Sequence, residues 1–219
     1  MNILSDYINN DYKPLDILDN VAVAQDFFVD VSFSHFPITE EGVFVGNLSG
    51  EDVETFDSNK KILDYKYTFE SFFTHKKDAW LDVLENFAQN QTTIMPVLDE
   101  NNSYLGYYEI ADVIRIFNET SFLKEPGNII VVEKSTNEYS FSQISQIVEG
   151  NNGRILGLFI SDSTNGKIQI TVKIAAGGMN EIIQTFRRYE YEIISNHEED
   201  NYINNLKERS EYLDKYLNI

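Results

Sequence analysis

The 219-residue sequence contains no cysteine, which excludes disulfide bonds, thiolate metal ligands and cysteine nucleophiles. No window approaches the run of about 18 apolar residues that a membrane-spanning helix needs. The first residues, MNILSDYINNDYKP, have neither the basic segment nor the apolar core of a secretory signal. Together these absences predict a cytoplasmic protein with no membrane partner.

Basic residues are scarce, with 17 lysines and arginines against 36 aspartates and glutamates and a formal net charge of −19. A field of that sign repels nucleic acid, so no nucleic-acid partner is expected. The field also opposes an anionic small ligand unless local donors overcome it. Hydrophobic residues make up 42% of the chain and are interleaved with the acids, which predicts a folded, globular protein.

Signatures of catalytic and metal sites are also missing. The three histidines, His35, His75 and His197, are scattered and form no pattern with metal-ligand spacing. No nucleophile elbow is present. The paired glycines of AAGGMNE, residues 175–181, lack the lysine of a phosphate-binding loop and predict a plain turn before a helix. We therefore expect a protein that is not an enzyme and holds no metal or resident cofactor.

The first half of the chain contains an internal repeat. SHFPITEEGVFVGNLSGEDV, residues 34–53, aligns with TIMPVLDENNSYLGYYEIADV, residues 93–113. Three pairs of residues coincide at a spacing of 59 or 60: Pro37 with Pro96, Gly46 with Gly106, and Asp52 with Asp112. A repeat of this length is typical of one supersecondary unit used twice.

Each copy is predicted to fold as helix, strand, turn, strand and helix. Apolar residues at spacings of three and four predict the leading helices: Ile17, Leu18, Val21 and Ala24 in one copy, and Trp80, Leu81, Leu84 and Phe87 in the other. The strand that follows contains the proline, which should lie at a strand start or an edge because it lacks an N–H group. A single copy is too small to bury both faces, so we expect the two sheets to pack together around one core.

The second half has a different order of elements. NIIVVEK predicts a strand, YSFSQISQIVEG a helix that stops near Gly150, and MNEIIQTFRRY a second helix. RILGLFIS and KIQITVKI are strands around Asn165-Gly166, a strong signal for a tight hairpin. YEYEIIS completes a βαββαβ order, the ferredoxin-like arrangement. Residues 197–219 predict a C-terminal helix, either docked on its own domain or placed between subunits.

These features resemble a known combination of modules. The tandem units with a proline on a strand and a G-x-x-S-x-x-D turn resemble a CBS-domain pair, or Bateman module, over residues 1–123, with repeat units at about 1–60 and 61–123. Residues 126–196 resemble an ACT domain in the order of their elements. The resemblance implies an α+β fold with a tandem CBS repeat, a ferredoxin-like ACT-type domain and a C-terminal helix.

The resemblance also implies a ligand site in the first copy. Ser49 and Asp52 stand three residues apart at a predicted helix start, where they could serve a phosphate and a ribose. His35, Phe36, Pro37 and Ile38 would border the base. The implied ligand is an adenosine nucleotide or a relative: AMP, ADP, ATP or S-adenosylmethionine. In the second copy Asp112 could reach a ribose, but Glu109 stands where the first copy has Ser49, which disfavours a phosphate there.

Alternative interpretations stay open for the Ser49–Asp52 turn, for the ACT-like region and for the function of the whole protein. Ser49 and Asp52 also have the spacing of a capping box, in which the serine only closes the helix start. The loop KSTNEYS lacks the glycine that ligand-binding ACT domains often have, which disfavours an amino-acid ligand. The sequence predicts a homodimeric regulatory protein that senses a nucleotide. The alternative is a ligand-free assembly protein whose modules mediate oligomerisation.

Overall fold

The computed structural model describes residues 3–175, 177–197 and 212. It divides into two compact units, residues 1–118 and 119–219, which are described separately. The short helix α5 (Ser121–Lys124) falls in the second unit. Residues 198–211 and 213–219 lie outside the described part, so the predicted C-terminal helix does too.

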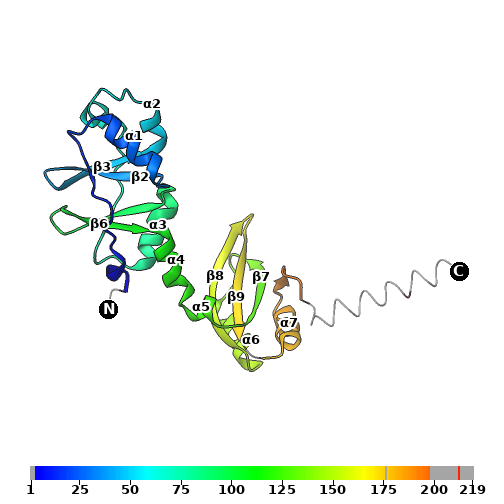
Figure 1. The fold of residues 1–219 in the computed structure, drawn as a ribbon. Helices are drawn as coiled ribbons and strands as arrows, with labels where there is room; N and C mark the ends of the chain where they lie inside the picture. The colour runs from blue at the N-terminus through cyan, green and yellow to red at the C-terminus, as the bar shows by residue number, and fades with distance from the viewer. Residues whose placement is uncertain (1–2, 176, 198–211, 213–219) are drawn as a thin grey trace. The chain divides into compact units, whose positions relative to one another are not determined.

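The first unit is a tandem repeat, as the sequence predicts (Figure 1). The first copy comprises β1 (Leu15–Asp16), α1 (Val21–Asp30), β2 (His35–Glu40), β3 (Val43–Ser49) and α2 (Gly50–Thr55). The second copy repeats that order as β4 (Thr74–His75), α3 (Trp80–Asn90), β5 (Ile94–Leu98), β6 (Tyr104–Glu109) and α4 (Ile110–Asn118). The 3-10 helices η1 (Ile3–Tyr7) and η2 (Ile62–Thr68) lie ahead of the first and second copies.

Each copy forms a three-stranded sheet, in the orders β1-β2-β3 and β4-β5-β6. The short parallel strands β1 and β4 are absent from the sequence prediction. The helix predicted from Ile17 begins only at Val21, because Ile17 lies just past the end of β1 in the core. The helix predicted from Trp80 is confirmed as α3.

Pro37 and Pro96 are each paired with a residue of only one neighbouring strand. Pro37 pairs with Asn47 on β3, whereas β1 pairs only with Ile38 and Thr39. Pro96 repeats this placement, because β4 pairs only from Val97 onward. Both prolines are the third residue of the central strand of a sheet, so the prediction of a strand start or an edge is wrong. The missing N–H costs no hydrogen bond to the third strand, because β1 and β4 do not extend to the prolines.

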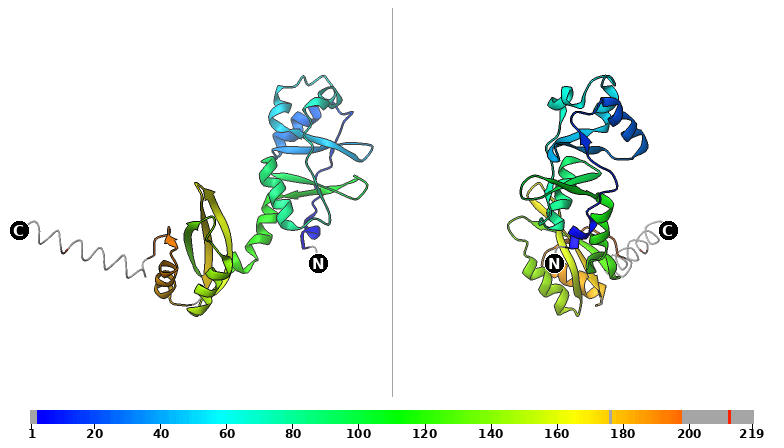
Figure 2. Two further views of the ribbon diagram at one scale, coloured as in Figure 1. Left: turned by 180° about the vertical axis from the view of Figure 1, so that it is seen from behind. Right: turned by 60° about the vertical axis from the view of Figure 1, so that its left-hand side comes forward.

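The two copies meet along a line of equivalent residues. The backbone N–H of Ser34 donates to Thr93 Oγ1 at 3.0 Å, and the N–H of Thr93 donates to Ser34 Oγ at 3.0 Å. Val43 and Ser103 join the two hairpins by an antiparallel bridge, and the hairpins run side by side (Figure 2). Reciprocal bonds between equivalent residues indicate that the copies face each other with local two-fold symmetry.

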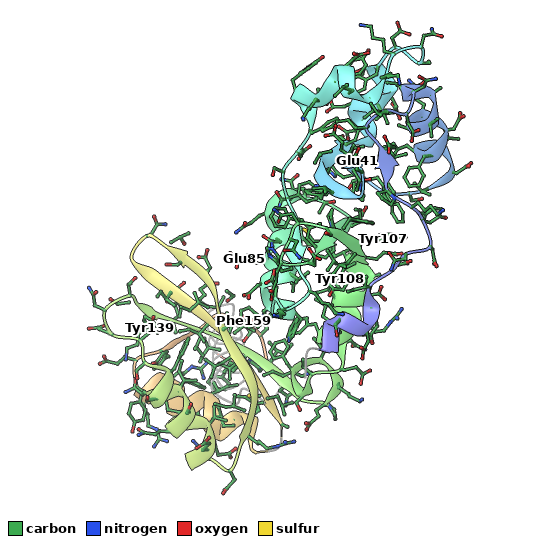
Figure 3. All side chains as sticks on the ribbon, turned by 90° about the vertical axis from the view of Figure 1, so that its left-hand side faces the viewer. Glu41, Glu85, Tyr107, Tyr108, Tyr139 and Phe159 are labelled. Carbon is green, nitrogen blue, oxygen red and sulfur yellow. The ribbon has the colours of Figure 1, made fainter. Side chains whose placement is uncertain are left out.

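The first unit has two buried clusters where one common core was expected. One cluster belongs to the first copy but includes Ile94 and Tyr107 of the second. The other belongs to the second copy and includes Phe72 of the linker. Tyr107 and Tyr108 on β6 enter different clusters, because successive strand residues point to opposite faces (Figure 3).

The second unit contains α5, β7 (Asn128–Ser135), α6 (Phe141–Gly150), β8 (Arg154–Thr164), β9 (Lys167–Ala175), α7 (Met179–Arg188) and β10 (Glu192–Ile193). All pairings in its sheet are antiparallel and the order is β10-β7-β9-β8. This topology confirms the predicted ferredoxin-like arrangement.

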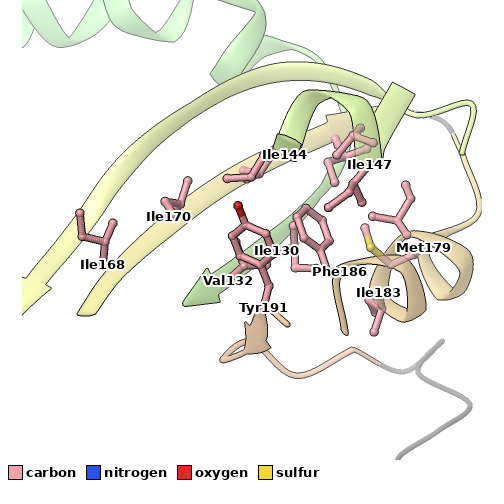
Figure 4. Close-up of a cluster of buried hydrophobic side chains, with 14 residues drawn as sticks. Ile130, Val132, Ile144, Ile147, Ile168, Ile170, Met179, Ile183, Phe186 and Tyr191 are labelled. Atoms are coloured by element: carbon pink, nitrogen blue, oxygen red, sulfur yellow. The ribbon is translucent and has the colours of Figure 1, made fainter. Parts of the chain in front are cut away.

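Helices α6 and α7 cover one face of this sheet. Ile144 and Ile147 of α6 and Phe186 of α7 pack on Ile130 and Ile170 of the strands (Figure 4). The β8–β9 hairpin turns at Asn165 and Gly166, with φ of 52° and 74°, the positive values that a type I′ turn requires. The hairpin prediction from Asn-Gly is therefore confirmed.

Candidate functional site

A cavity of about 690 Å³ lies between the two copies of the first unit. Its first-copy wall comes from α1, the start of β2, the end of β3 and α2, and its second-copy wall from the end of α3. The lining residues are Phe28, Phe33, Ser34, His35, Ser49, Gly50, Glu51, Asp52, Glu54, Glu70, Gln89, Asn90 and Gln91. A volume of this size accommodates a small-molecule ligand.

The β2–β3 hairpin brings the predicted site residues together. His35 is the direct partner of Ser49 in the antiparallel ladder, although 14 positions separate them. The backbone N–H of Gly50 then donates to Ser34 O at 2.9 Å, which fixes the start of α2 beside β2. Asp52 follows in the first turn of that helix. Three predicted residues, His35, Ser49 and Asp52, thus line one cavity.

The capping-box interpretation of Ser49 is wrong. Ser49 occupies the N-cap position of α2 with extended φ and ψ of −76° and 136°, but its side chain makes no capping hydrogen bond. Glu51 and Asp52 in the first turn offset the helix dipole instead. The Ser49 hydroxyl is therefore not engaged in closing the helix, and it lies on the cavity wall.

His35 is held at both ring nitrogens. Nδ1 lies 2.9 Å from Ser34 Oγ, and Nε2 lies 3.1 Å from Glu70 Oε1. The side chain is 12% exposed, and its ring meets Phe72 edge-on at 5.3 Å. His35 is therefore a positioned element of the cavity wall, oriented by the seam residue Ser34 and the linker residue Glu70.

The other predicted base-slot residues lie elsewhere. Phe36 and Ile38 are fully buried in the first copy's core and do not line the cavity. Phe36 stacks with Phe33 at 5.8 Å between ring centroids, so it supports a wall residue from behind. Pro37 is buried in β2 and also lies outside the lining.

The second-copy residues are arranged differently. Glu109 pairs with Ile94 as Ser49 pairs with His35, which places Glu109 and Ser49 at equivalent positions. The Asn9 amide donates to Glu109 Oε1 at 3.2 Å. Asp112 forms an ion pair with Arg115 at 3.2 Å and does not line the cavity.

Two glycines of the repeat allow neighbouring chain segments to approach the sheets closely. One segment contains Phe69 and Glu70, between the two copies, and the other contains Asn9, ahead of the first copy. Gly46 and Gly106 have φ of 151° and 146°. A Cβ at Gly46 would lie 2.9 Å from Phe69 Cβ, and one at Gly106 would lie 2.6 Å from Asn9 O. The glycine of the motif therefore allows a chain segment to run close beside the edge strand, where Glu70 bridges Asn47 of β3 and Asn9 bridges Tyr107 of β6. In the first copy, that segment delivers Glu70 to the cavity.

Several lining residues are missing from the sequence prediction. Ser34 precedes the quoted proline by only three positions, but its bonding to the second copy becomes evident only in the fold. Glu70 comes from the linker, and Gln89 to Gln91 come from the other copy. No local motif marks these residues, because their proximity depends on the packing of the two copies.

Neither a metal-binding cluster nor a membrane-spanning helix is found among the described residues. Within 3–175, 177–197 and 212, no three His, Asp or Glu residues are placed to hold a metal ion. No helix in that part of the chain has the length and apolar character needed to cross a membrane.

Comparisons with known proteins give the following similarities. No protein-family profile matches the chain. An uncharacterized protein of Methanocaldococcus jannaschii is 29% identical over an alignment of 114 residues, and the match covers 48% of this chain and 40% of that protein. The chain thus matches less than half of this curated relative's length.

Two solved structures are similar to about half of the chain. A CBS domain pair/ACT domain protein from Thermotoga maritima is 20% identical and covers 53% of this chain and 96% of its own, with a TM-score of 0.49. CBSX2, solved in complex with AMP, is 15% identical and covers 52% and 94%, with a TM-score of 0.45. The duplicated sheets and helices of the first unit themselves have the architecture expected of a CBS-domain pair. The ACT assignment of the second unit stays a prediction.

Proposed function

We propose that the chain is a regulatory protein without catalytic activity whose first unit senses an adenosine nucleotide or a related adenosyl compound. The observation that carries the proposal is the cavity between the copies, where the hairpin register brings Ser49, Asp52 and His35 together. Among the similar structures, CBSX2 was solved in complex with AMP and the cytosolic domain of the Mg²⁺ channel MgtE in complex with ATP. A cytoplasmic location is part of the same proposal.

The cavity offers distinct groups to such a ligand. The Asp52 carboxylate can accept from both ribose hydroxyls, and the unspent Ser49 hydroxyl can donate to a polar group beside them. Phe28 and Phe33 provide apolar surface for a base. Because both copies contribute walls, a bound ligand would favour one packing of the copies over another. We propose that the ACT-like unit receives this change.

Thermal unfolding in the presence of ligands tests this function. AMP, ADP, ATP and S-adenosylmethionine are added at millimolar concentration, and at least one should raise the melting temperature, because a ligand that binds only the folded state stabilises it. Asp52→Ala should abolish that shift. Asp112→Ala, its counterpart in the repeat, should preserve it because Asp112 pairs with Arg115 away from the cavity. The proposal fails if no compound shifts the transition. Loss of the shift in Asp112→Ala alone would refute the site placement.

A second candidate function, assembly, is favoured by the sheet of the second unit. Strand β8 is 11 residues long and lies at one edge of the sheet. Phe159 and Ile160 on this strand are 47% and 42% exposed. An exposed edge strand presents unpaired backbone N–H and C=O groups, which form a template for pairing with a second chain. We propose that β8 mediates the homodimer.

The mass in solution tests the assembly role. Light scattering should give twice the chain mass for the wild-type protein. Ile160→Lys places a charge on the exposed edge and should give the monomer mass, because a charged edge opposes strand pairing. Val29→Lys introduces the same charge on α1 at a residue that is 85% exposed, and should leave the dimer intact. A monomeric wild-type protein would exclude the assembly role of β8.

A further inference from the structure

The charge of the cavity wall is strongly one-sided. Glu51, Asp52, Glu54 and Glu70 all line the cavity, and no lysine or arginine does among the described residues. The background has the same sign, since residues 1–118 contain 21 of the 36 acidic residues but only 7 of the 17 basic ones. A phosphate entering this cavity would meet several carboxylates without a cation to offset them.

The histidine of the lining does not change this balance. His35 already has Glu70 at 3.1 Å from Nε2 and Ser34 at 2.9 Å from Nδ1. Both ring nitrogens thus already have partners, and one of these partners is a carboxylate. His35 is therefore a weak partner for an anionic ligand.

The helix ends beside the cavity reinforce the preference for positive charge. Helix α2 has six residues, and its first turn already contains Glu51 and Asp52. Helix α3 has 11 residues and ends with Asn90 and the C-cap residue Gln91, both of which line the cavity. The C-terminal end of a helix has a partial negative charge. The carboxylates of Glu51 and Asp52 thus offset the partial positive charge at the start of α2, and the end of α3 adds negative potential to the cavity.

The aromatic wall suits the same ligand chemistry. Phe28 and Phe33 line the cavity, and each contacts Phe27 behind it, at 5.4 and 6.4 Å between ring centroids. Aromatic faces attract onium cations as well as planar bases. A ligand that joins an adenine base to a positively charged centre would use both properties of the wall.

We infer that this cavity selects an adenosyl ligand with a positive charge, such as an adenosyl sulfonium, over adenosine phosphates. The inference rests on the proposed function and specifies the ligand class of the same site. Asp52 is placed for the ribose, and Glu51, Glu54 and Glu70 provide the field that favours the cation.

Isothermal titration of the full chain with five ligands tests the inference. S-adenosylmethionine and S-adenosylhomocysteine differ by one methyl group and the sulfonium charge, so they form a matched pair. S-adenosylmethionine should bind about tenfold more tightly than S-adenosylhomocysteine, because one charge is attracted by several carboxylates. Adenosine should bind more tightly than AMP, and AMP more tightly than ATP. Added salt should weaken S-adenosylmethionine binding and strengthen AMP binding.

Charge-neutral variants locate the effect in the cavity. The double variant Glu51→Gln/Glu54→Gln should weaken S-adenosylmethionine binding about tenfold and strengthen AMP binding, because two of the wall's negative charges are removed. The control Glu40→Gln/Glu41→Gln removes the same charge at the exposed hairpin turn and should change both affinities less than about twofold.

The outcomes separate this inference from the proposed function. If AMP or ATP binds more tightly than S-adenosylmethionine, the charge selection is wrong and the sensing function stands. Equal affinity for S-adenosylmethionine and S-adenosylhomocysteine likewise overturns the selection. If none of the five ligands binds, the proposed function fails together with the inference.

Discussion

Two serines at helix starts show how the role of a residue type depends on its local bonds. Ser140 caps α6, because its side chain accepts from the N–H of Gln143 at 3.3 Å. Ser49 occupies the same position at α2 and makes no such bond. The capping signature predicts a structural role for Ser49, but the hydroxyl is left for another partner on the cavity wall.

Replacing these two serines by alanine separates the roles. Ser140→Ala should lower the free energy of unfolding by about 1 kcal/mol, the typical loss of an N-cap bond. Ser49→Ala should change it by less than about 0.5 kcal/mol, because no cap bond is lost. Urea unfolding measures both values. A loss at Ser49 equal to that at Ser140 would restore the capping interpretation.

A glycine substitution tests the close approach of the N-terminal segment around Asn9 to the edge strand β6. Gly106→Ala should lower the free energy of unfolding by about 1–3 kcal/mol, because its Cβ would lie 2.6 Å from Asn9 O at a φ of 146°. Gly150→Ala is the control, since nothing lies within 4 Å of its Cβ and its φ is not positive. The control should be neutral or stabilising by up to about 1 kcal/mol. Equal stability of the two variants would contradict the close approach of Asn9 to Gly106.

A buried tyrosine makes stability depend on alkaline pH. Burial raises the pKa of Tyr108 to about 12, with a smaller contribution from Asp78, whereas an unfolded tyrosine ionises near pH 10. Between these values the unfolded chain loses a proton that the folded chain retains. The stabilising contribution of Tyr108 is therefore complete below about pH 10 and declines as the pH rises toward 12.

Tyr108→Phe isolates the contribution of Tyr108 to the loss of stability at alkaline pH. Among the described residues the Tyr108 hydroxyl has no hydrogen-bond partner, so the variant should be no less stable than wild type at pH 8. From pH 10 to 11 its free energy of unfolding should fall less steeply than that of wild type. Parallel pH profiles in urea unfolding would contradict the assignment.

At the scale of elements, the sequence predicts what depends on short-range patterns. Asn165-Gly166 correctly predicts the β8–β9 hairpin, because few residue pairs accept two positive φ values. The periodic residues Trp80, Leu84 and Phe87 correctly predict α3. Strands β1 and β4 are missed, because two residues are too few to establish an alternating pattern. Ile17 and Leu18 extend the helical spacing of α1 by chance, although they precede its start.

The candidate site divides in the same way. Ser49 and Asp52 are predictable because one turn places them together, and His35 because the repeat marks the strand before the turn. Glu70 and Gln91 are not predictable from local patterns. Glu70 reaches the cavity from the segment between the two copies, which runs beside β3, and Gln91 reaches it from the second copy. Phe36 and Ile38 point to the opposite face of β2 from His35 and so enter the core.

At the scale of the whole molecule, the two copies of the repeat share a backbone arrangement but differ in the charge of equivalent side chains. The register of β2 with β3 matches that of β5 with β6, including a bulge after Ile38 and after Val97. The two copies nevertheless differ at a pair of equivalent positions that is decisive for an anionic ligand, Ser49 in the first copy and Glu109 in the second. Duplication thus supplies the architecture, and single substitutions restrict the proposed binding to the first-copy cavity.

We propose that a ligand occupies this cavity and not the equivalent region of the second copy. A crystal structure of the full chain grown with S-adenosylmethionine and, separately, with AMP tests it most directly. We expect ligand density beside Ser49 and Asp52, with the base near Phe28 or Phe33 and with higher occupancy for S-adenosylmethionine. Density beside Glu109 and Asp112 with an empty first-copy cavity would contradict it.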